Sequence, residues 1–362
     1  MADILNERKL KILRAIVDDY ITTGVPVGSR TISKKYLDWS SATIRNEMMD
    51  LEELGYLVQP HTSAGRVPSE RAYRLYVEQL MNVSELNGDE VENLKSHLSA
   101  RSRDLKQLFH DAAKAISDAT TYTAFVMPPN PLGIKIRNIQ LVPVTSGLAL
   151  LVLVTDAGIF KDTFIRVSPE FGQEELQSIN KLLQRNLCGH SLNGVLTRLE
   201  GQMKDSVDDQ RQVLDAILDS IKSQLFEEES QEIVVGGSSN LLKHREYSDI
   251  EKARALLSAM ESRETLGSIL QGAKGLQFTV TIGNENPHEI MRDCSVVTVS
   301  YIVDGAPTGS IGVIGPTRMN YSHVTSVLNY MKNMMSDILS SSYDDSIKSL
   351  EEHNKNENTG KE

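Results

Sequence analysis

The feature that most constrains the fold is the stretch GYLVQPHTSAGRVPSERAY at residues 55–73, which follows three short amphipathic segments. A short apolar segment in it is stopped by Pro60, and small or polar residues then lead to a second apolar pair, Val67-Pro68. β-Prone residues on either side of Gly and Pro predict two short strands around a tight turn, with Arg66 near the tip. Because a lone two-stranded hairpin is only marginally stable in water, this ribbon must pack on the helices beside it.

Two helices are predicted at the start of the chain. Apolar residues at helical spacing indicate a helix over about residues 5–22 that ends at Gly24. After a short connector, Ser29 is placed to cap a second helix that continues to about Tyr36. Ile32 and Tyr36 are expected to face inward from this second helix.

A third helix precedes the ribbon, and a fourth follows it from Pro68. Ser40 is a suitable cap for the third helix, and Trp39 and Ile44 stand where a hydrophobic staple places them. The order helix, short helix, turn, helix, two-stranded ribbon is that of a winged helix-turn-helix domain, whose third helix can lie in the major groove of DNA. The predicted buried stripe of the third helix is Ile44, Met48, Leu51 and Leu54.

The outer faces of this region carry side chains suited to DNA. Arginine pairs well with guanine edges, asparagine with adenine, and an alanine methyl can contact a thymine methyl. Hydroxyl and cationic groups on the second helix and near the cap of the third suit phosphates, and the ribbon supplies a wing contact. The predicted DNA-binding residues are Arg30, Thr31, Lys34, Lys35, Ser41, Ala42, Thr43, Arg45, Asn46, Met49, His61 and Arg66.

Other interpretations of this region stay open. Three helices and a hairpin also occur in domains that bind proteins. Asp50, Glu52 and Glu53 crowd the second half of the third helix, where they would repel phosphates if they faced DNA. The DNA-binding interpretation is favoured because base contacts usually come from the first part of that helix. Trp39 is interpreted as a packing residue and not as a platform for stacked bases.

The charge of the chain is unevenly distributed. The net charge of −11 disfavours a nucleic-acid partner if it is taken alone. Residues 1–80 hold 11 Lys or Arg and 11 Asp or Glu, whereas the rest holds 27 basic and 38 acidic residues. An electroneutral head on an acidic body lets one end approach DNA while the other stays soluble.

Composition points to a cytoplasmic, non-enzymatic protein of two or three domains. Two cysteines cannot form a disulfide framework or a cysteine zinc site, the apolar run Leu148–Val154 is too short to span a bilayer, and the charged N-terminus is not a signal peptide. The motif GSIGVIG at 309–315 is neither a dinucleotide fingerprint nor a P-loop, and no histidine pair has metal-ligand spacing. We expect no catalytic residue, metal, cofactor or membrane partner.

The remaining chain is predicted to be a sheet domain split by an insertion. A heptad stripe predicts one long helix over about residues 89–120, which is a connector in the favoured interpretation and a dimer seam in the other. Strands are expected near 136–144, 147–154 and 159–167, helices near 172–226, the strand EIVVGG, and a helix over about 248–272. Three strands, LQFTVTIG, SVVTVSYIV and GSIGVIG, lead to a last helix, and the polar tail from 342 is expected to be disordered.

Four long segments carry a resemblance to a known family. They are PVGSRTISKKY, SSATIRNEMMDLEELGYLVQPHTSAGRVPSERAYRLYV, GNENPHEIMRDCSVVTVSY and GSIGVIGPTRMNYSHV. In order and distance these resemble the heat-inducible transcription repressors of the HrcA family. The resemblance implies a homodimeric repressor of chaperone operons that binds an inverted-repeat operator called CIRCE and loses activity under heat stress, with the chaperonin GroEL as partner.

The resemblance also implies an α+β multidomain fold. Its parts are an N-terminal winged helix-turn-helix domain and a GAF-like α/β domain with an inserted dimerisation domain. On this chain we place the head at 1–82, a connector helix at 83–120, the GAF-like domain at 121–169 and 248–341, and the insertion at 170–247, followed by the tail, 342–362. Because GAF-like folds elsewhere bind small ligands, a transcription factor controlled by a small molecule is the alternative function.

Overall fold

The structure is a computed structural model that describes residues 5–62, 64–98, 105–128, 135–155, 160–167, 172–190, 213–217, 219–220, 233–262, 265–267, 278–303 and 306–359. The chain divides into two compact units. The first consists of residues 1–126, 234–299 and 311–331, and the second of residues 127–233, 300–310 and 332–362. None of the helices described here is long and apolar enough to cross a membrane.

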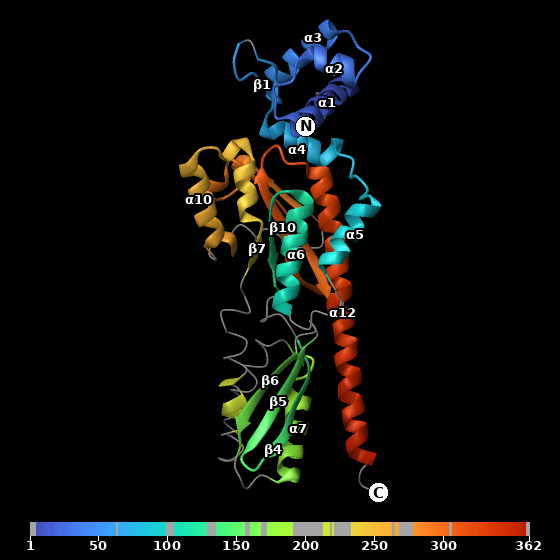
Figure 1. The fold of residues 1–362 in the computed structure, drawn as a ribbon, viewed down its shortest axis with the longest axis vertical. Coiled ribbons are helices and arrows are strands. Elements are labelled where there is room, and N and C mark those ends of the chain that lie inside the picture. The colour runs from blue at the N-terminus through green and yellow to red at the C-terminus, as the bar shows by residue number, and fades with distance from the viewer. Residues whose placement is uncertain are drawn as a thin grey trace. The chain divides into compact units, whose positions relative to one another are not determined.

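Three helices form the start of the first unit (Figure 1). α1 (Glu7–Thr23) begins at Asn6, whose side chain accepts a hydrogen bond from the Lys9 amide, and ends at Gly24 in the left-handed conformation, φ 62°. α2 (Ser29–Lys35) and α3 (Ser41–Glu53) follow at the predicted places. Ser40 caps α3 as predicted, because its side chain accepts a hydrogen bond from the Thr43 amide.

Two details of these helices differ from the prediction. Gly28, not Ser29, is the N-cap of α2, and Ser29 is its first helical residue. Tyr36 does not face inward, since its side chain is 42% exposed and only its hydroxyl is anchored, by donation to Asp19 at 3.0 Å. The stripe of α3 is confirmed at Ile44, Met48 and Leu51, which are buried. Leu54, beyond the helix end, is only half-buried.

The predicted ribbon is present, but its turn is not tight. β1 (Leu57–Val58) pairs antiparallel with β2 (Val67–Pro68), so Val58 faces Val67 across an eight-residue connection. Val27, ahead of α2, adds a third strand position through two backbone hydrogen bonds of 2.8 Å with Arg66. Gly65 permits this approach, because a Cβ there would lie 2.5 Å from the Val27 carbonyl oxygen. This extra bridge stabilises a ribbon that would be marginal alone.

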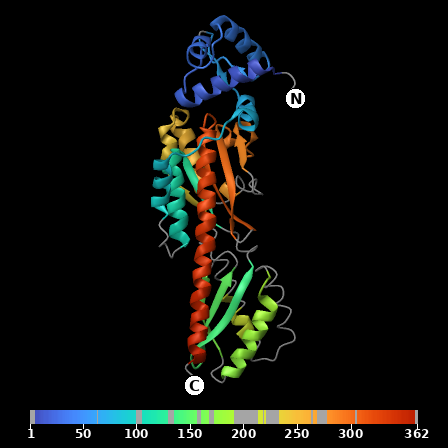
Figure 2. The same ribbon diagram turned by 90° about the vertical axis from the view of Figure 1, so that its right-hand side faces the viewer.

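The single long helix predicted over 89–120 is instead two helices. After α4 (Glu70–Leu75) and a π-helical turn at Tyr76–Leu80, α5 spans Gly88–His97 and α6 spans Leu105–Thr120. α5 ends because Leu98 leaves the helical conformation, at φ −102° and ψ 71°. α5 packs beside α6, so the heptad stripe serves packing within the first unit (Figures 1 and 2).

A five-stranded sheet forms the centre of the body, in the order β7-β3-β10-β9-β8. The expected strands are confirmed as β7 (Val234–Gly236), β8 (Thr279–Ile282), β9 (Cys294–Val303) and β10 (Ala306–Pro316), and β3 (Thr123–Met127) is an additional strand. The glycines of GSIGVIG accommodate aromatic rings: a Cβ at Gly312 would lie 2.4 Å from the Phe125 ring, and one at Gly315 2.8 Å from the Tyr122 ring.

Helices pack along this sheet. α10 (Ile250–Glu261) is shorter than the predicted helix over 248–272, and residues 268–272 lie outside the described residues. The expected last helix is α12 (Tyr321–Thr359), which buries Val324, Val327, Leu328, Met331 and Met335 and leaves Ile338 half-buried. The prediction of a disordered tail from 342 is wrong, since α12 continues to Thr359. Neither Gly nor Pro interrupts the sequence between Pro316 and Gly360, so nothing local ends the helix earlier.

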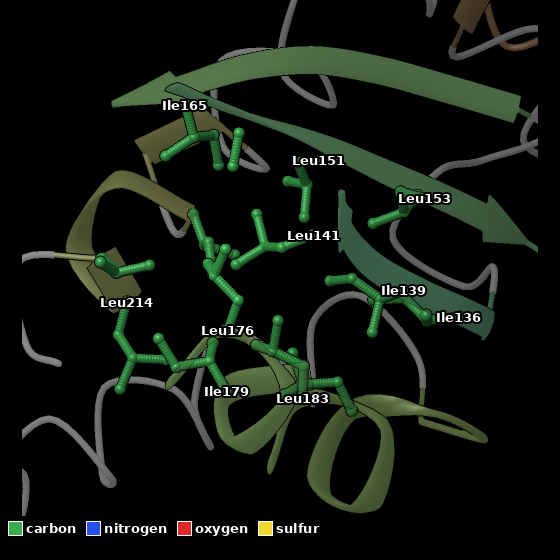
Figure 3. Close-up of a cluster of buried hydrophobic side chains, with 14 residues drawn as sticks. Ile136, Ile139, Leu141, Leu151, Leu153, Ile165, Leu176, Ile179, Leu183 and Leu214 are labelled. Carbon is green, nitrogen blue, oxygen red and sulfur yellow. The ribbon is translucent and has the colours of Figure 1, made fainter. Parts of the chain in front are cut away.

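The second unit has a sheet of its own. β4 (Ile136–Thr145), β5 (Leu148–Thr155) and β6 (Phe160–Arg166) form an antiparallel sheet in that order. One face packs on α7 (Gln173–Leu187), as Figure 3 shows, where Leu141, Leu151 and Leu183 are buried together. Asn180 fastens α7 to the edge of this sheet, accepting from the Leu141 amide at 2.7 Å and donating to its carbonyl at 2.9 Å.

This sheet changes the domain boundaries. We expected residues 121–169 to belong to the split sheet domain and the insertion to cover 170–247. Strands β4–β6 pair with one another and not with the five-stranded sheet, whereas β7 pairs with β3 in that sheet. By compactness, the second unit includes residues 127–233, and residues 234–247 belong to the first unit. Most of the helical segments expected over 172–226 after α7 lie outside the described residues.

Candidate nucleic-acid interface

α3 is held by the core that it shares with α1. Ile44 and Leu51 of α3 are fully buried, as are Ile12 and Ile16 of α1, and the two helices are in contact. Burying four such side chains stabilises this arrangement by about 1.5–3 kcal/mol each. The opposite face of α3 is left to solvent.

That exposed face carries the predicted base-contacting residues. Ala42, Arg45 and Asn46 are exposed, and Met49 is 48% exposed. Within the part of the chain that the structure describes, neither Arg45 nor Asn46 has an ion-pair or side-chain hydrogen-bond partner. Their donors and acceptors are consequently available to a ligand at the position where a recognition helix presents them.

The acidic residues of α3 are neutralised inside the protein. Lys9 of α1 lies 2.7 Å from Glu47 and 2.7 Å from Asp50, and Arg8 lies 3.6 Å from Glu47. Glu52 is paired with Arg66 at 2.8 Å. Among the described acidic residues of this helix, only Glu53 lacks an ion-pair partner. The repulsion of phosphates that the acidic second half of α3 suggested is thus largely compensated.

The N-terminal end of α3 is built from hydroxyl groups. Ser40 caps the helix at 3.1 Å from the Thr43 amide, and its hydroxyl lies 2.9 Å from the Thr43 hydroxyl. The Ser41 hydroxyl lies 3.0 Å from that of Ser29 in α2. These contacts fix α2 against α3 while keeping Ser41 and Thr43 beside amides that carry partial positive charge. The helix end is thereby suited to an anion such as a phosphate.

α2 presents two free cations and one that is paired. Arg30 and Lys34 are exposed and have no ion-pair partner among the described residues, whereas Thr31 is half-buried. Lys35 pairs with the buried carboxylate of Asp19 at 3.1 Å. Asp19 also accepts from the Tyr36 hydroxyl, and burial together with this carboxylate raises the pKa of Tyr36 to about 12. Lys35 therefore has a structural role besides any contact with DNA.

The ribbon places its two candidate residues differently. His61 is exposed in the connection between the strands, where the Gln59 amide group donates to the carbonyls of Thr62 at 3.0 Å and Ala64 at 3.1 Å. Arg66 lies at the base of the ribbon and not near its tip. Its side chain is 17% exposed and its guanidinium donates to Glu52.

Two contributors to this surface were not found from sequence. Val27 supports the ribbon through the backbone, and no side-chain pattern reports such a bridge. The Arg8 guanidinium lies over the Trp39 ring, 5.6 Å from its centre, and so joins the start of α1 to the residue before the α3 cap. The sequence around Arg8 contains nothing that indicates a contact with Trp39, which is 31 positions away.

Comparison with known proteins bears on this arrangement. The family described as "HrcA protein C terminal domain" matches residues 106–325. The "Heat-inducible transcription repressor HrcA" of Ruminiclostridium cellulolyticum is 40% identical over 334 residues, covering 91% of this chain and 96% of that protein. The protein of the same name from Clostridioides difficile is 40% identical over 332 residues, covering 90% and 97%.

A solved structure is similar as well. A crystal structure described as that of a hypothetical protein at 2.2 Å resolution is 28% identical, covers 93% of this chain and 99% of its own, and superposes with a TM-score of 0.63. Taken with the curated relatives, these similarities place the chain among transcription regulators and not among enzymes. More particularly, the chain belongs to the HrcA family, whose curated members are named heat-inducible transcription repressors.

Proposed function

We propose that this protein represses transcription by binding operator DNA through α3, and that residues 1–82 act as a winged helix-turn-helix domain. The observation that carries the proposal is the outer face of α3. Arg45 and Asn46 are exposed there without intramolecular partners, while Glu47, Asp50 and Glu52 on the same helix are paired. A helix with free base-contacting groups and compensated acids is suited to the major groove.

The other candidates take roles that follow from their placement. Arg30 and Lys34 of α2 bind phosphates beside the groove, together with the hydroxyls of Ser41 and Thr43. Ala42 and Met49 give apolar contacts to base methyl groups. His61 is the exposed wing residue. Thr31, Lys35 and Arg66 act mainly by positioning these groups, because each is half-buried or held in an ion pair.

Two heads in a homodimer bind the two halves of an inverted repeat of the CIRCE type. The family resemblance supports this arrangement, with the body as a GAF-like domain and the inserted unit, about residues 127–233, as the dimerisation domain. A two-fold axis in the protein requires a matching axis in the operator. The protein acts in the cytoplasm and loses activity under heat stress, with the GroEL chaperonin as a partner that promotes the active repressor.

Control by a small ligand has less support. The space beside Gly312 and Gly315 of β10 is occupied by the rings of Phe125 and Tyr122, which leaves no room for a ligand at these two positions. Purified protein free of small molecules is therefore expected to bind the operator fully.

Gel-shift titration tests the proposal. Arg45→Ala or Asn46→Ala is expected to weaken binding to an inverted-repeat operator by about 1–3 kcal/mol and binding to random DNA much less. Arg14→Ala is the matched control, because it removes the same charge from α1, where Arg14 is partly exposed and pairs only loosely with Asp18 on its own helix, at 3.7 Å. Equal losses on operator and random DNA, or equal losses for Arg14→Ala and Arg45→Ala, would show that α3 does not contact bases.

A further inference from the structure

Arg318 of the body contacts the last turn of α1 in the head. Arg318 lies between β10 and α12, and its Nε donates to one carboxylate oxygen of Glu246 while Nη2 donates to the other at 3.3 Å. Its Nη1 faces the carbonyl oxygen of Ile21, in the last turn of α1, at 3.5 Å. The guanidinium is thus shared between a carboxylate of the body and the end of a head helix.

The end of α1 is built to receive this cation. The last turn of α1 contains no basic residue, although the free carbonyls at a helix C-terminus carry partial negative charge. Gly24 ends the helix and leaves space directly above Arg318: a Cβ at Gly24 would lie 3.3 Å from the guanidinium carbon. The cation that α1 lacks locally is supplied by a residue nearly three hundred positions away in sequence.

Further polar contacts join the head to the body. Arg74 of α4 pairs with Glu285 and donates to the Val280 carbonyl of edge strand β8 at 2.7 Å. Glu70 accepts two hydrogen bonds from Asn284, at 3.1 and 3.0 Å. Such contacts depend on geometry and ionic strength more than apolar packing does.

One aromatic pair lies among these polar contacts. Tyr73 of α4 meets Tyr321 of α12 with ring centres 6.0 Å apart, and Tyr73 is only 2% exposed. Within the described residues its hydroxyl has no hydrogen-bond partner, which is unfavourable where such a group is buried. The aromatic contact between head and body therefore includes an unsatisfied hydroxyl, that of Tyr73. We infer that the contacts of Arg318 and Arg74 hold the orientation of the head on the body.

We propose that Arg318 is a positioning residue that locks the head on the five-stranded sheet. In the dimer this lock sets the separation of the two α3 helices and hence the half-site spacing that the repressor accepts. Arg318 touches no DNA in this scheme. The effect on half-site spacing rests on the proposed function, whereas the lock between head and sheet is a property of the free protein alone.

Trp39 allows the lock to be measured without DNA. It is the only tryptophan of the chain and lies in the head, so the decay of its fluorescence anisotropy reports how the head moves. In the full-length protein, Arg318→Ala is expected to add a fast component to this decay. Arg292→Ala is the matched control, because Arg292 makes only a local ion pair with Glu289, at 3.3 Å in the body.

DNA binding gives the second measurement. Duplexes with the operator half-sites at the natural spacing, or moved apart by two or five base pairs, are titrated beside a single half-site. Arg318→Ala is expected to bind the natural operator about tenfold more weakly, to distinguish the spacings less, and to bind the single half-site unchanged, because looser linkage lowers the effective concentration of the second head.

Two further variants guard against simple misfolding. Arg318→Lys keeps the charge but loses the planar fork, and it should give intermediate values in both measurements. The exchange of Arg318→Glu with Glu246→Arg restores the ion pair but places a carboxylate at the end of α1, so it should not restore the lock. Full restoration by this exchange would overturn the proposal.

The outcomes separate the lock from the proposed function. An anisotropy decay and spacing preference that are unchanged in Arg318→Ala would overturn the lock even if the operator is bound. Failure of the wild-type protein to bind any operator would remove the proposed function, and the anisotropy result would still decide whether Arg318 holds the head.

Discussion

Lys9 of α1 and Glu47 of α3 form an ion pair of 2.7 Å, in which the two side chains are 13% and 11% exposed. Hydrogen bonds from Lys9 to Asp50 and Glu47 raise the pKa of the lysine. The pair crosses from the first helix to the helix that carries the candidate base contacts. It fixes the rotation of α3 about its axis, and together with Arg8 it compensates the charges of Glu47 and Asp50 beside the candidate DNA-binding face.

Replacement of Lys9 by Met should affect both stability and DNA binding. Glu47 would lose its main partner in a largely buried position, which is expected to lower the free energy of unfolding by about 1–3 kcal/mol. Urea denaturation followed by Trp39 fluorescence measures this change. Lys11→Met is the control, since Lys11 pairs only with exposed Glu7 on its own helix. A similar loss of unfolding free energy in both variants would show that the ion pair between Lys9 and Glu47 does not stabilise the fold.

Arg66 provides a test that separates two roles. As a phosphate contact, its loss in Arg66→Ala would make the dependence of log Kobs on log salt shallower by about one unit. As the partner of Glu52, its loss would instead leave an uncompensated carboxylate on α3. The structure favours the second role, so the double variant Arg66→Ala with Glu52→Gln should recover most of the lost affinity. If it recovers none, Arg66 contacts DNA directly.

The head could be predicted from sequence because its signals are local. Ser40 caps the helix that follows it, and Gly24 ends the helix before it, each within one turn of its own position. The errors in the head concern distant partners. Arg66 looked like a residue at the tip of a ribbon because its pairing with Glu52 and with Val27 is set by tertiary structure.

The body was predicted less well because strand pairing is non-local. The segments of β4–β6 and β8–β10 are all rich in β-prone residues, and nothing in their sequences states which sheet each one joins. β3 pairs with β7 across the whole insertion, from Val126 to Val234. The break between α5 and α6 was hidden because a heptad stripe continues across it.

Gly65 should be required for the ribbon. A methyl group in Gly65→Ala would meet the Val27 carbonyl oxygen at 2.5 Å and force the bridge to Arg66 apart. We expect thermal unfolding at a lower temperature and weaker operator binding, with a stability loss of about 1–3 kcal/mol. Gly88→Ala is the control, because a Cβ there meets nothing within 4 Å. An unchanged Gly65→Ala protein would show that the bridge to Val27 is dispensable.

His244 should make the body sensitive to acid. Its ring stacks on Tyr122 with centres 5.2 Å apart, and burial lowers the pKa of the imidazole. The unfolded chain then binds a proton more readily than the folded one, so stability is lost as the pH falls below the ordinary value of about 6.5. His244→Gln should flatten this part of the stability curve, measured by urea midpoints between pH 5 and 7.5. His110→Gln, the same change at an exposed site of α6, is the control. A slope that stays the same in His244→Gln contradicts this assignment.

Removal of the insertion tests the two-headed mechanism. β3 and β7 are antiparallel neighbours with Val126 opposite Val234. A short turn can therefore replace residues 128–232 and leave all five strands of the sheet in place. The truncated protein is expected to be a monomer, seen by sedimentation, with an unchanged affinity for a single half-site. Its affinity for the full operator should fall by roughly two to four orders of magnitude, because engagement of two linked sites is lost. The control for handling and purity is the Arg292→Ala variant, which keeps the insertion. A folded monomer that binds the full operator as tightly as the intact chain would refute the dependence of repression on two linked heads.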